Sequence, residues 1–257
     1  GKIEFGDRFF HCWKTKGHGN VSLIKGIKES CDCYFYELAN RLGIDEIAKM
    51  AKKLGLGSFT NIELPSEKKG IIPNMQWKKN TLKESWYKGE TLIAGIGQGY
   101  ILTTPIQLAR MTSIIANGGN FITPTLILNN SKKENNQRKI NLNIENINYI
   151  KDAMTRVVNE NLGTAFASRS DKNKYIFAGK TGSSQVIKIT LEEREREDFR
   201  KKEIKWKNKD HALFVGYMPV EKPKYSICVI IEHGGSGSSI AAPIAREVFN
   251  EIYKLSI

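Results

Sequence analysis

The sequence predicts an α+β fold, because helical patterns come first, strand patterns follow and an amphipathic helix closes the chain. Helices and strands that are segregated along a chain indicate an antiparallel sheet with packed helices. We therefore expect a central antiparallel sheet, the closing helix on one of its faces and a mostly helical subdomain opposite. One domain over residues 1–257 accommodates all of these elements.

The helical part follows an irregular stretch with aromatics and glycines over residues 1–20. Apolar spacing and capping residues predict helices at 30–42, 45–54, 104–116, 150–159 and 240–252. The clearest start is Thr104, an N-cap that is followed by Pro105 in the first turn. The closing helix carries its apolar residues on one face, at Ile240, Ile244, Val248 and Ile252.

Residues 58–90 form a long polar and aromatic connection, and connections of this length in compact domains are often functional. Strand composition predicts β-strands at 175–186, 212–218 and 225–233, the last two joined by a turn that contains two prolines. Between the first two strands, residues 192–209 carry charges of both signs, which is typical of an exposed helix or loop.

The formal net charge is +13, while 40% of the residues are hydrophobic. Such a charge indicates a nucleic acid, an anionic membrane surface or an acidic substrate as partner, or a solvated basic face. Because the lysine clusters lack interleaved aromatics, we favour the solvated face and expect no nucleic-acid partner. No apolar run approaches the roughly 20 residues that span a bilayer, and the first residues given do not have the pattern of a signal peptide.

The segment Lys180-Thr181-Gly182-Ser183 lies on the first predicted strand. A lysine there places a fixed positive charge beside a cleft, and the hydroxyl of Thr181 can bind a carboxylate. Gly182 lets a substrate backbone approach closely, and the backbone N–H of Ser183 can face a developing oxyanion. A tripeptide of this kind is weak evidence when it stands alone.

Ser30-Cys31-Asp32 stands at the start of a predicted helix. Ser30 as an N-cap and Asp32 as a first-turn acid would give both residues a purely structural role. Serine acyl-transfer enzymes, however, combine S-x-x-K, S-D-N and K-T-G motifs, and this chain has counterparts of the second and third in the correct order.

Between these two motifs lies a segment from Gly97-Gln98-Gly99 to Thr104-Pro105 that resembles a signature of penicillin-binding transpeptidases. Flanking segments are similar to the elongation-specific group of that family, which also has aspartate at the position of Asp32. These segments are His18-Gly19, 86–89, 163–165 and 232–235. The resemblance covers nearly the whole chain and implies the penicillin-binding, β-lactamase-like transpeptidase fold.

The resemblance also implies an activity and partners. A family member is a peptidoglycan D,D-transpeptidase, which cross-links stem peptides that end in D-Ala-D-Ala by serine acyl transfer and is the target of β-lactam antibiotics. It works with other cell-wall elongation proteins at the periplasmic face of the bacterial inner membrane.

Residue roles follow from the same resemblance. The catalytic residues would be Ser30, Asp32 and Lys180, and the substrate-binding residues Thr181, Gly182 and Ser183. Ser30 would relay a proton to the leaving amine, and Asp32 would orient the substrate or a catalytic lysine. Lys180 and Thr181 would bind the terminal carboxylate, and the Ser183 N–H would supply half of an oxyanion hole.

The nucleophile of the family belongs to an S-x-x-K motif that lies well upstream of the second motif and usually follows Pro-Gly. Ser22-Leu23-Ile24-Lys25 matches S-x-x-K literally, but it lies only a few residues before Ser30, lacks Pro-Gly and falls where the family has an ordinary helix. We therefore expect the nucleophile, the pedestal domain and the membrane anchor to precede Gly1, and this fragment alone to be inactive.

Cys12, His18 and Cys31 combine two thiols and an imidazole within a short span, which suits Zn²⁺. A structural zinc site usually has four ligands, and the fourth would be an upstream residue or one of His11, Cys33 and Asp7. The alternative is a set of buried free thiols. Catalysis by serine acyl transfer needs no cofactor, so a zinc ion here would be structural.

Other function classes fit the sequence less well. A P-loop would need glycine where the chain has Lys174, and the run from Gly234 to Ser238 lacks the last glycine of G-x-S-x-G. The remaining alternative is a non-catalytic β-lactam-binding sensor or a scaffold fragment of the same fold.

Overall fold

The computed structural model describes residues 1–127, 138–171, 175–187 and 204–255. Its strands are β1 Lys2–Phe5, β2 Arg8–His11, β3 Ala178–Ser184, β4 His211–Met218 and β5 Tyr225–Ile231. Its α-helices are α1 Leu23–Lys28, α2 Asp32–Leu42, α3 Ile44–Lys53, α4 Met75–Leu82, α5 Lys88–Gly95, α6 Pro105–Ala116, α7 Ile144–Asn159 and α9 Ala242–Leu255. Short helical turns lie at Phe166–Ser168, Trp206–Asn208 and Gly237–Ala241.

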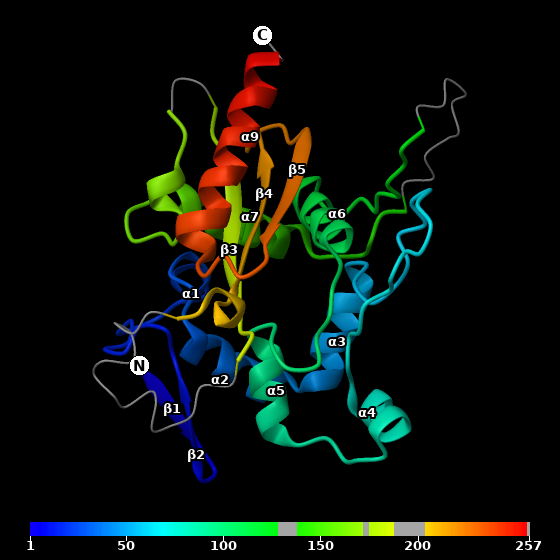
Figure 1. Ribbon diagram of the computed structural model, residues 1–257, viewed down its shortest axis with the longest axis vertical. Helices are drawn as coiled ribbons and strands as arrows, with labels where there is room; N and C mark the ends of the chain where they lie inside the picture. The colour runs from blue at the N-terminus through cyan, green and yellow to red at the C-terminus, as the bar shows by residue number, and fades with distance from the viewer. Residues whose placement is uncertain (128–137, 172–174, 188–203, 256–257) are drawn as a thin grey trace.

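The main sheet is antiparallel and has the order β3-β4-β5 among the described residues. Its register pairs Lys180 with Val215 across β3 and β4, and Val215 with Cys228 across β4 and β5. Figure 1 shows this sheet and its helices in one half of the molecule and the helices α2 to α5 in the other half. The α+β prediction is confirmed, since helices and an antiparallel sheet come in the expected order.

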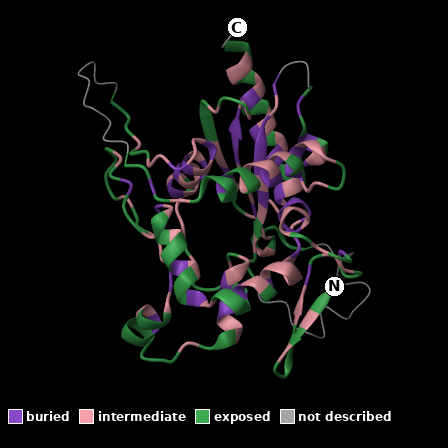
Figure 2. Ribbon diagram, turned by 180° about the vertical axis from the view of Figure 1, so that it is seen from behind, coloured by how far each residue is buried: buried purple, intermediate pink, exposed green. Residues whose placement is uncertain are grey.

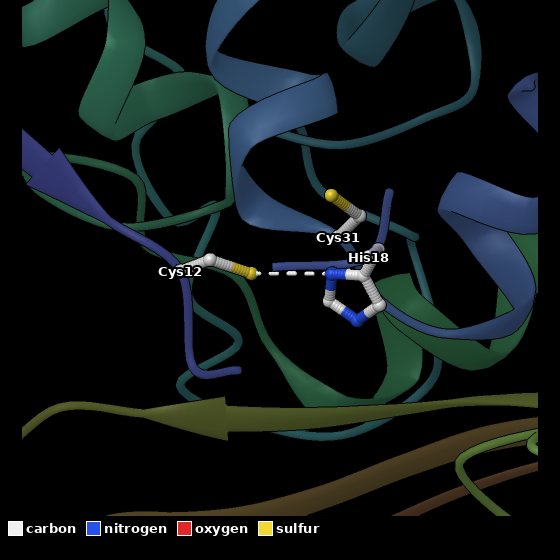
Figure 3. A group of neighbouring side chains, drawn as sticks. All are labelled: Cys12, His18 and Cys31. Atoms are coloured by element: carbon white, nitrogen blue, oxygen red, sulfur yellow. Dashed lines mark hydrogen bonds between the residues drawn. The ribbon is translucent and has the colours of Figure 1, made fainter. Parts of the chain in front are cut away.

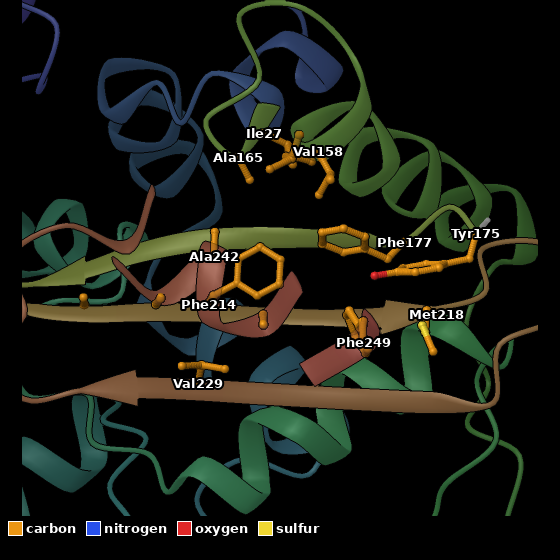
Figure 4. Close-up of a cluster of buried hydrophobic side chains, with 14 of the residues drawn as sticks. Ile27, Val158, Ala165, Tyr175, Phe177, Phe214, Met218, Val229, Ala242 and Phe249 are labelled. Atoms are coloured by element: carbon orange, nitrogen blue, oxygen red, sulfur yellow. The ribbon is translucent and has the colours of Figure 1, made fainter. Parts of the chain in front are cut away.

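The core lies on both faces of this sheet. On one face, α9 packs Phe249 against Phe177 and Phe214, all fully buried, with ring centroids 5.3 Å apart for Phe249 and Phe177 (Figure 4). On the other face, Ala116 of α6 and Met154 of α7 cover Tyr217 of β4. Burial is concentrated in the strands and the helices that flank them, whereas much of α3 and α4 is exposed (Figure 2).

Local signals placed several elements correctly. Thr104 caps α6, and its hydroxyl accepts from the N–H of Gln107 while the Gln107 side chain accepts from the N–H of Thr104. This reciprocal pair satisfies two backbone donors that the helix itself leaves unpaired. Gly43 ends α2, as the glycine predicted, with a positive φ of 78° that a glycine adopts without strain.

Three expectations about the elements are wrong. Residues 1–20 are not irregular throughout, since β1 and β2 form a hairpin over residues 2–11 whose strands are too short to give a recognisable alternation. The connection 58–90 contains the helix α4, whose eight residues include few apolar ones. The face of α9 that enters the core carries Ala245 and Phe249, whereas Ile244 and Val248 stay 39% and 40% exposed.

Two further findings concern membrane-spanning helices and the charge run at residues 192–209. Within the described residues, no helix has the length and apolar content that crossing a bilayer requires. Of the charge run 192–209, residues 192–203 lie outside the described part, and Trp206–Asn208 form a single helical turn.

Candidate functional site

The second motif adopts a strained turn rather than a helix cap. Ser30 has a positive φ of 54°, Cys31 is the N-cap of α2 without a side-chain hydrogen bond, and the helix begins at Asp32. The interpretation of Ser30 as an N-cap is therefore wrong. Non-glycine residues in this left-handed region cost of order 1 kcal/mol or more, so the surrounding structure must hold the turn.

Ser30 is turned toward the third motif. Its Oγ accepts a hydrogen bond from Lys180 Nζ at 3.0 Å, although the two residues are 150 positions apart in the sequence. Lys180 Nζ also donates to the Thr181 carbonyl at 2.8 Å. The second and third motifs thus meet at the amine of Lys180.

Burial governs the charge state of this lysine. Desolvation lowers the pKa of Lys180 from 10.5 to about 8, and the nearby Asp32 carboxylate opposes that shift. The amine remains mostly protonated at pH 7, yet it gives up its proton more easily than an exposed lysine. It can therefore act as a cation toward an anionic group and as a hydrogen-bond donor to Ser30.

Asp32 belongs to the same turn and lies close enough to Lys180 for the two charges to interact. Its Oδ2 accepts from the backbone N–H of Trp13 at 2.9 Å. Burial raises the pKa of Asp32, and the hydrogen bonds from Trp13 and from the Cys12 thiol partly offset that rise. The carboxylate is thus tied to the segment that follows β2.

The remaining residues of the third motif lie along β3, at the edge of the main sheet. Thr181 is buried, and its Oγ1 lies 2.7 Å from Oγ1 of Thr164. The Thr181 hydroxyl, which is expected to bind a carboxylate, is therefore hydrogen-bonded to Thr164 in this structure. Ser183 is exposed, and its carbonyl accepts from the Gln98 side chain at 2.9 Å. The short helical turn Gly237–Ala241 packs closely on β3, because a Cβ at Gly237 would lie 2.3 Å from the Gly182 carbonyl oxygen.

The literal S-x-x-K segment has a structural role. Ser22 is the N-cap of α1 and accepts from the backbone N–H of Lys25. The Nζ of Lys25 donates to the carbonyls of His18 and Asn20 at 2.6 and 3.0 Å. The lysine thus fastens the preceding loop and does not activate Ser22.

Cys12, His18 and Cys31 converge, as Figure 3 shows. All three are buried, and one ligand atom from each lies within 4.8 Å of the other two. Cys12 Sγ and His18 Nδ1 are 3.6 Å apart, and burial lowers the pKa of His18 and raises the pKa of Cys31. In the described part of the chain, the proposed fourth ligands His11, Cys33 and Asp7 do not join the group within that distance.

The donors of this cluster suit a soft divalent ion. Two thiols and one imidazole supply three of the four ligands of a tetrahedral zinc site, and His18 Nδ1 is the ring nitrogen that faces Cys12 Sγ. The cluster lies directly behind the second motif, since Cys31 stands between Ser30 and Asp32. An ion here would fix the turn that carries both residues.

Sequence reasoning missed three residues that shape this site. Gln98 belongs to the glycine segment, whose pattern predicts no role for its side chain, and Thr164 lies in a flanking segment that indicates only the family resemblance. Trp13 gave no signal at all, because its partners lie 16 to 19 residues away and follow no periodic pattern.

Comparison with known proteins places this geometry in context. A family profile described as the penicillin binding protein transpeptidase domain matches residues 1–250. The chain is 39% identical over 249 residues to the peptidoglycan D,D-transpeptidase MrdA of Acinetobacter baumannii, an alignment that covers 94% of this chain and 36% of that protein.

Two solved structures are similar in fold. One is penicillin-binding protein 2 of Helicobacter pylori in complex with MreC, with a TM-score of 0.85, 34% identity and coverage of 99% of this chain and 44% of that one. The other is penicillin-binding protein 2 of Pseudomonas aeruginosa in complex with WCK 5153, with a TM-score of 0.82, 35% identity and coverage of 97% and 52%. The chain thus spans well under half the length of the curated relative and about half of these structures.

Proposed function

Because the chain belongs to the penicillin-binding protein transpeptidase family, we propose that it is part of a peptidoglycan D,D-transpeptidase of the penicillin-binding protein 2 kind. The observation that carries this proposal is the 3.0 Å hydrogen bond between Lys180 Nζ and Ser30 Oγ. A serine that only capped α2 would direct its hydroxyl to the backbone N–H groups of that helix, but Ser30 does not.

The proposed reaction is acyl transfer in two steps. A serine oxygen attacks the carbonyl carbon of the D-Ala-D-Ala peptide bond, the C–N bond breaks, and the terminal D-Ala leaves with a proton on its nitrogen. The amine of a second stem peptide then attacks the ester, forms the new peptide bond and releases the serine with its proton restored. Both steps move a proton between the serine oxygen and an amine nitrogen.

Ser30 is suited to carry that proton. Since its Oγ accepts from Lys180, its own O–H is free to donate toward the departing nitrogen. The Lys180 cation keeps this donor oriented and, with Thr181, attracts the terminal carboxylate of the substrate. Asp32 lies near the Lys180 charge, and its role in this reaction would be to orient the substrate or the lysine that activates the nucleophile.

The exposed edge of β3 completes the binding site. A stem peptide that lies antiparallel to β3 meets the backbone groups of Ser183, whose N–H supplies half of an oxyanion hole. The Gln98 side chain donates to the carbonyl of Ser183, so the substrate exchanges partners with Gln98 as it binds.

The acylated serine belongs to a part of the protein outside this chain. Within the described residues, Ser30 is the serine that meets the Lys180 amine, yet it lies next to no S-x-x-K lysine, and Ser22 is a helix cap. The second half of the oxyanion hole would be the backbone N–H of that missing serine.

Intact-mass spectrometry after incubation with a penicillin tests the proposal. We expect the whole protein to gain the full mass of the drug, because ring opening releases no leaving group, and the isolated chain to gain nothing. Peptide mapping should place the adduct on a serine outside residues 1–257. An adduct on Ser22 or Ser30, or an unmodified whole protein, would contradict the proposal.

A non-catalytic β-lactam sensor of the same fold is the second candidate, because penicillin would acylate it in the same way. Release of D-Ala from a pentapeptide stem separates the two functions. A transpeptidase releases D-Ala, and it incorporates an added amino-acceptor in its place. A sensor does neither, although it is acylated by penicillin.

The whole protein is proposed to act at the periplasmic face of the bacterial inner membrane, with peptidoglycan stem peptides as substrates and β-lactams as inhibitors. The complex of the Helicobacter pylori relative with MreC supports an association with other cell-wall elongation proteins. Nothing in this role calls for nucleic acid.

We also propose that Cys12, His18 and Cys31 hold a structural zinc ion. The geometry that supports it is the convergence of three buried ligand atoms within 4.8 Å. Their thiols would bind as thiolates, so zinc binding would release protons and weaken as the pH falls. The ion would stabilise the turn at Ser30 and take no part in acyl transfer.

A further inference from the structure

The turn that carries Ser30 needs a support that the second motif itself does not contain. Ser30 is left-handed with φ 54° just after α1, where its N–H donates to the Ile27 carbonyl at 3.3 Å and the N–H of Cys31 donates to the Gly26 carbonyl at 2.9 Å; neither bond holds the carbonyls of Glu29 and Ser30 themselves. The following residue, Cys31, caps α2 without a side-chain hydrogen bond. A conformation of this kind persists only where neighbouring groups determine it.

Trp13 contacts this turn at three places. Its indole Nε1–H donates to the carbonyls of Glu29 at 3.1 Å and Ser30 at 2.8 Å. Its backbone N–H donates to Asp32 Oδ2 at 2.9 Å. One residue from the segment after β2 therefore binds both the carbonyl side and the carboxylate side of the Ser30-Cys31-Asp32 turn.

Hydrophobic burial does not explain Trp13. Its side chain is 54% exposed, and its ring makes an edge contact with His18 at a centroid distance of 5.5 Å. A tryptophan placed mainly for packing would be largely covered. What distinguishes this residue is a donor-only N–H directed at two carbonyls of a strained turn.

We propose that Trp13 is a positioning residue, whose indole N–H fixes the Ser30 carbonyl so that the Ser30 hydroxyl meets Lys180. This inference rests on the proposed acyl transfer and assigns that reaction a further participant. Trp13 acts through Ser30, because the carbonyl it holds and the hydroxyl that meets Lys180 belong to the same residue. It need not touch the substrate.

A Trp13→Phe variant of the whole protein tests this inference, because phenylalanine keeps a ring but has no donor. We expect the second-order rate constant for acylation by a fluorescent penicillin to fall about tenfold, which corresponds to one hydrogen bond to a partly exposed carbonyl. Trp86→Phe is the matched control, since Trp86 Nε1 donates at 2.8 Å to Thr91, a residue outside the site. Its acylation rate should stay within twofold of the wild type.

A double-mutant cycle separates positioning from general stability. In a Ser30→Ala background, Trp13→Phe should cause no further loss of acylation rate, because the hydroxyl it positions is already absent. An equal tenfold loss in both backgrounds would show that Trp13 only stabilises the fold and would overturn the inference. A Trp13→Phe rate within twofold of the wild type would also overturn it.

A second variant keeps the test valid if Trp13→Phe folds poorly. Replacement of Trp13 by 3-benzothienylalanine changes the N–H to sulfur and leaves the bicyclic shape intact. The same tenfold loss is expected from it at an unchanged melting temperature, and a normal rate would overturn the inference. A wild-type protein that is not acylated at all would overturn the proposed function, and the role of Trp13 with it.

Discussion

The unfolding free energy of a Lys180→Met variant, measured relative to the wild type, is expected to fall as the pH rises from 7 to 10. Methionine keeps most of the side-chain length and removes the charge. In the wild type, burial lowers the pKa of Lys180 from 10.5 to about 8, so the unfolded chain binds this proton more tightly than the folded protein. The wild type therefore carries a penalty at pH 7 that disappears as the pH rises through the interval from 8 to 10.5.

The two pKa values limit the size of the effect. Their difference corresponds to at most about 3.4 kcal/mol, and because Lys180 is partly exposed the penalty is nearer to about 1–3 kcal/mol. Methionine also loses the hydrogen bonds to Ser30 and to the Thr181 carbonyl, each worth about 1 kcal/mol at any pH in this range. Near pH 7 these contributions roughly cancel, whereas near pH 10 the variant should be less stable by about 2 kcal/mol.

Urea unfolding followed by circular dichroism at pH 7, 8.5 and 10 measures this difference. Groups that titrate in both proteins cancel in the comparison, and Lys222→Met, at an exposed position in the turn after β4, serves as the matched control. If the difference between Lys180→Met and the wild type is independent of pH, the Lys180 amine is not desolvated in the folded protein. The electrostatic account of the site would then be wrong.

Four further outcomes are expected. The purified protein should contain zinc in stoichiometric amount by elemental mass spectrometry, and Cys31→Ala should lose it while Cys228→Ala keeps it; zinc in both variants, or in neither the variants nor the wild type, contradicts the cluster. Phe214→Ala should lower the unfolding free energy by about 3–5 kcal/mol in urea, because Phe214 is fully buried in the main core, and a loss under 1 kcal/mol would refute that packing. Gly179→Ala should cost about 1–3 kcal/mol in the same assay, since its Cβ would lie 2.1 Å from the Phe214 ring. Ser22→Ala should lose about 1 kcal/mol as a missing N-cap and leave penicillin acylation unchanged; abolished acylation would restore Ser22 as a candidate nucleophile.

Short-range chemistry made much of the fold predictable. The start of α6 at Thr104 and Pro105, the end of α2 at Gly43 and the antiparallel order of the last strands all depend on neighbours within a few positions. Such contacts depend only on residues that are close in the sequence, so capping rules and periodicity can predict them. The motifs at Ser30 and Lys180 were likewise visible, because each is a short run of specific residues.

Elements with weak local signals were missed or misplaced. The hairpin of β1 and β2 has four residues in each strand, and α4 has eight residues with few apolar ones. The apolar residues of α9 predicted a helix, but Phe249 enters the core and Val248 does not. Which stripe of a helix is buried depends on the partner it packs against, and that partner lies far away in the sequence.

Short motifs and periodic patterns in the sequence are enough to give the class of fold, the family and the candidate residues of the site. Three contacts follow from the tertiary structure alone: the hydrogen bond between Lys180 and Ser30, the convergence of Cys12, His18 and Cys31, and the hydrogen bond from Trp13 to the Ser30 carbonyl. Each of these contacts joins segments whose approach depends on the packing of the sheet and helices as a whole. A strained turn and a desolvated lysine are unfavourable locally, so no local rule predicts them, and they persist because the rest of the fold is stable enough to hold them.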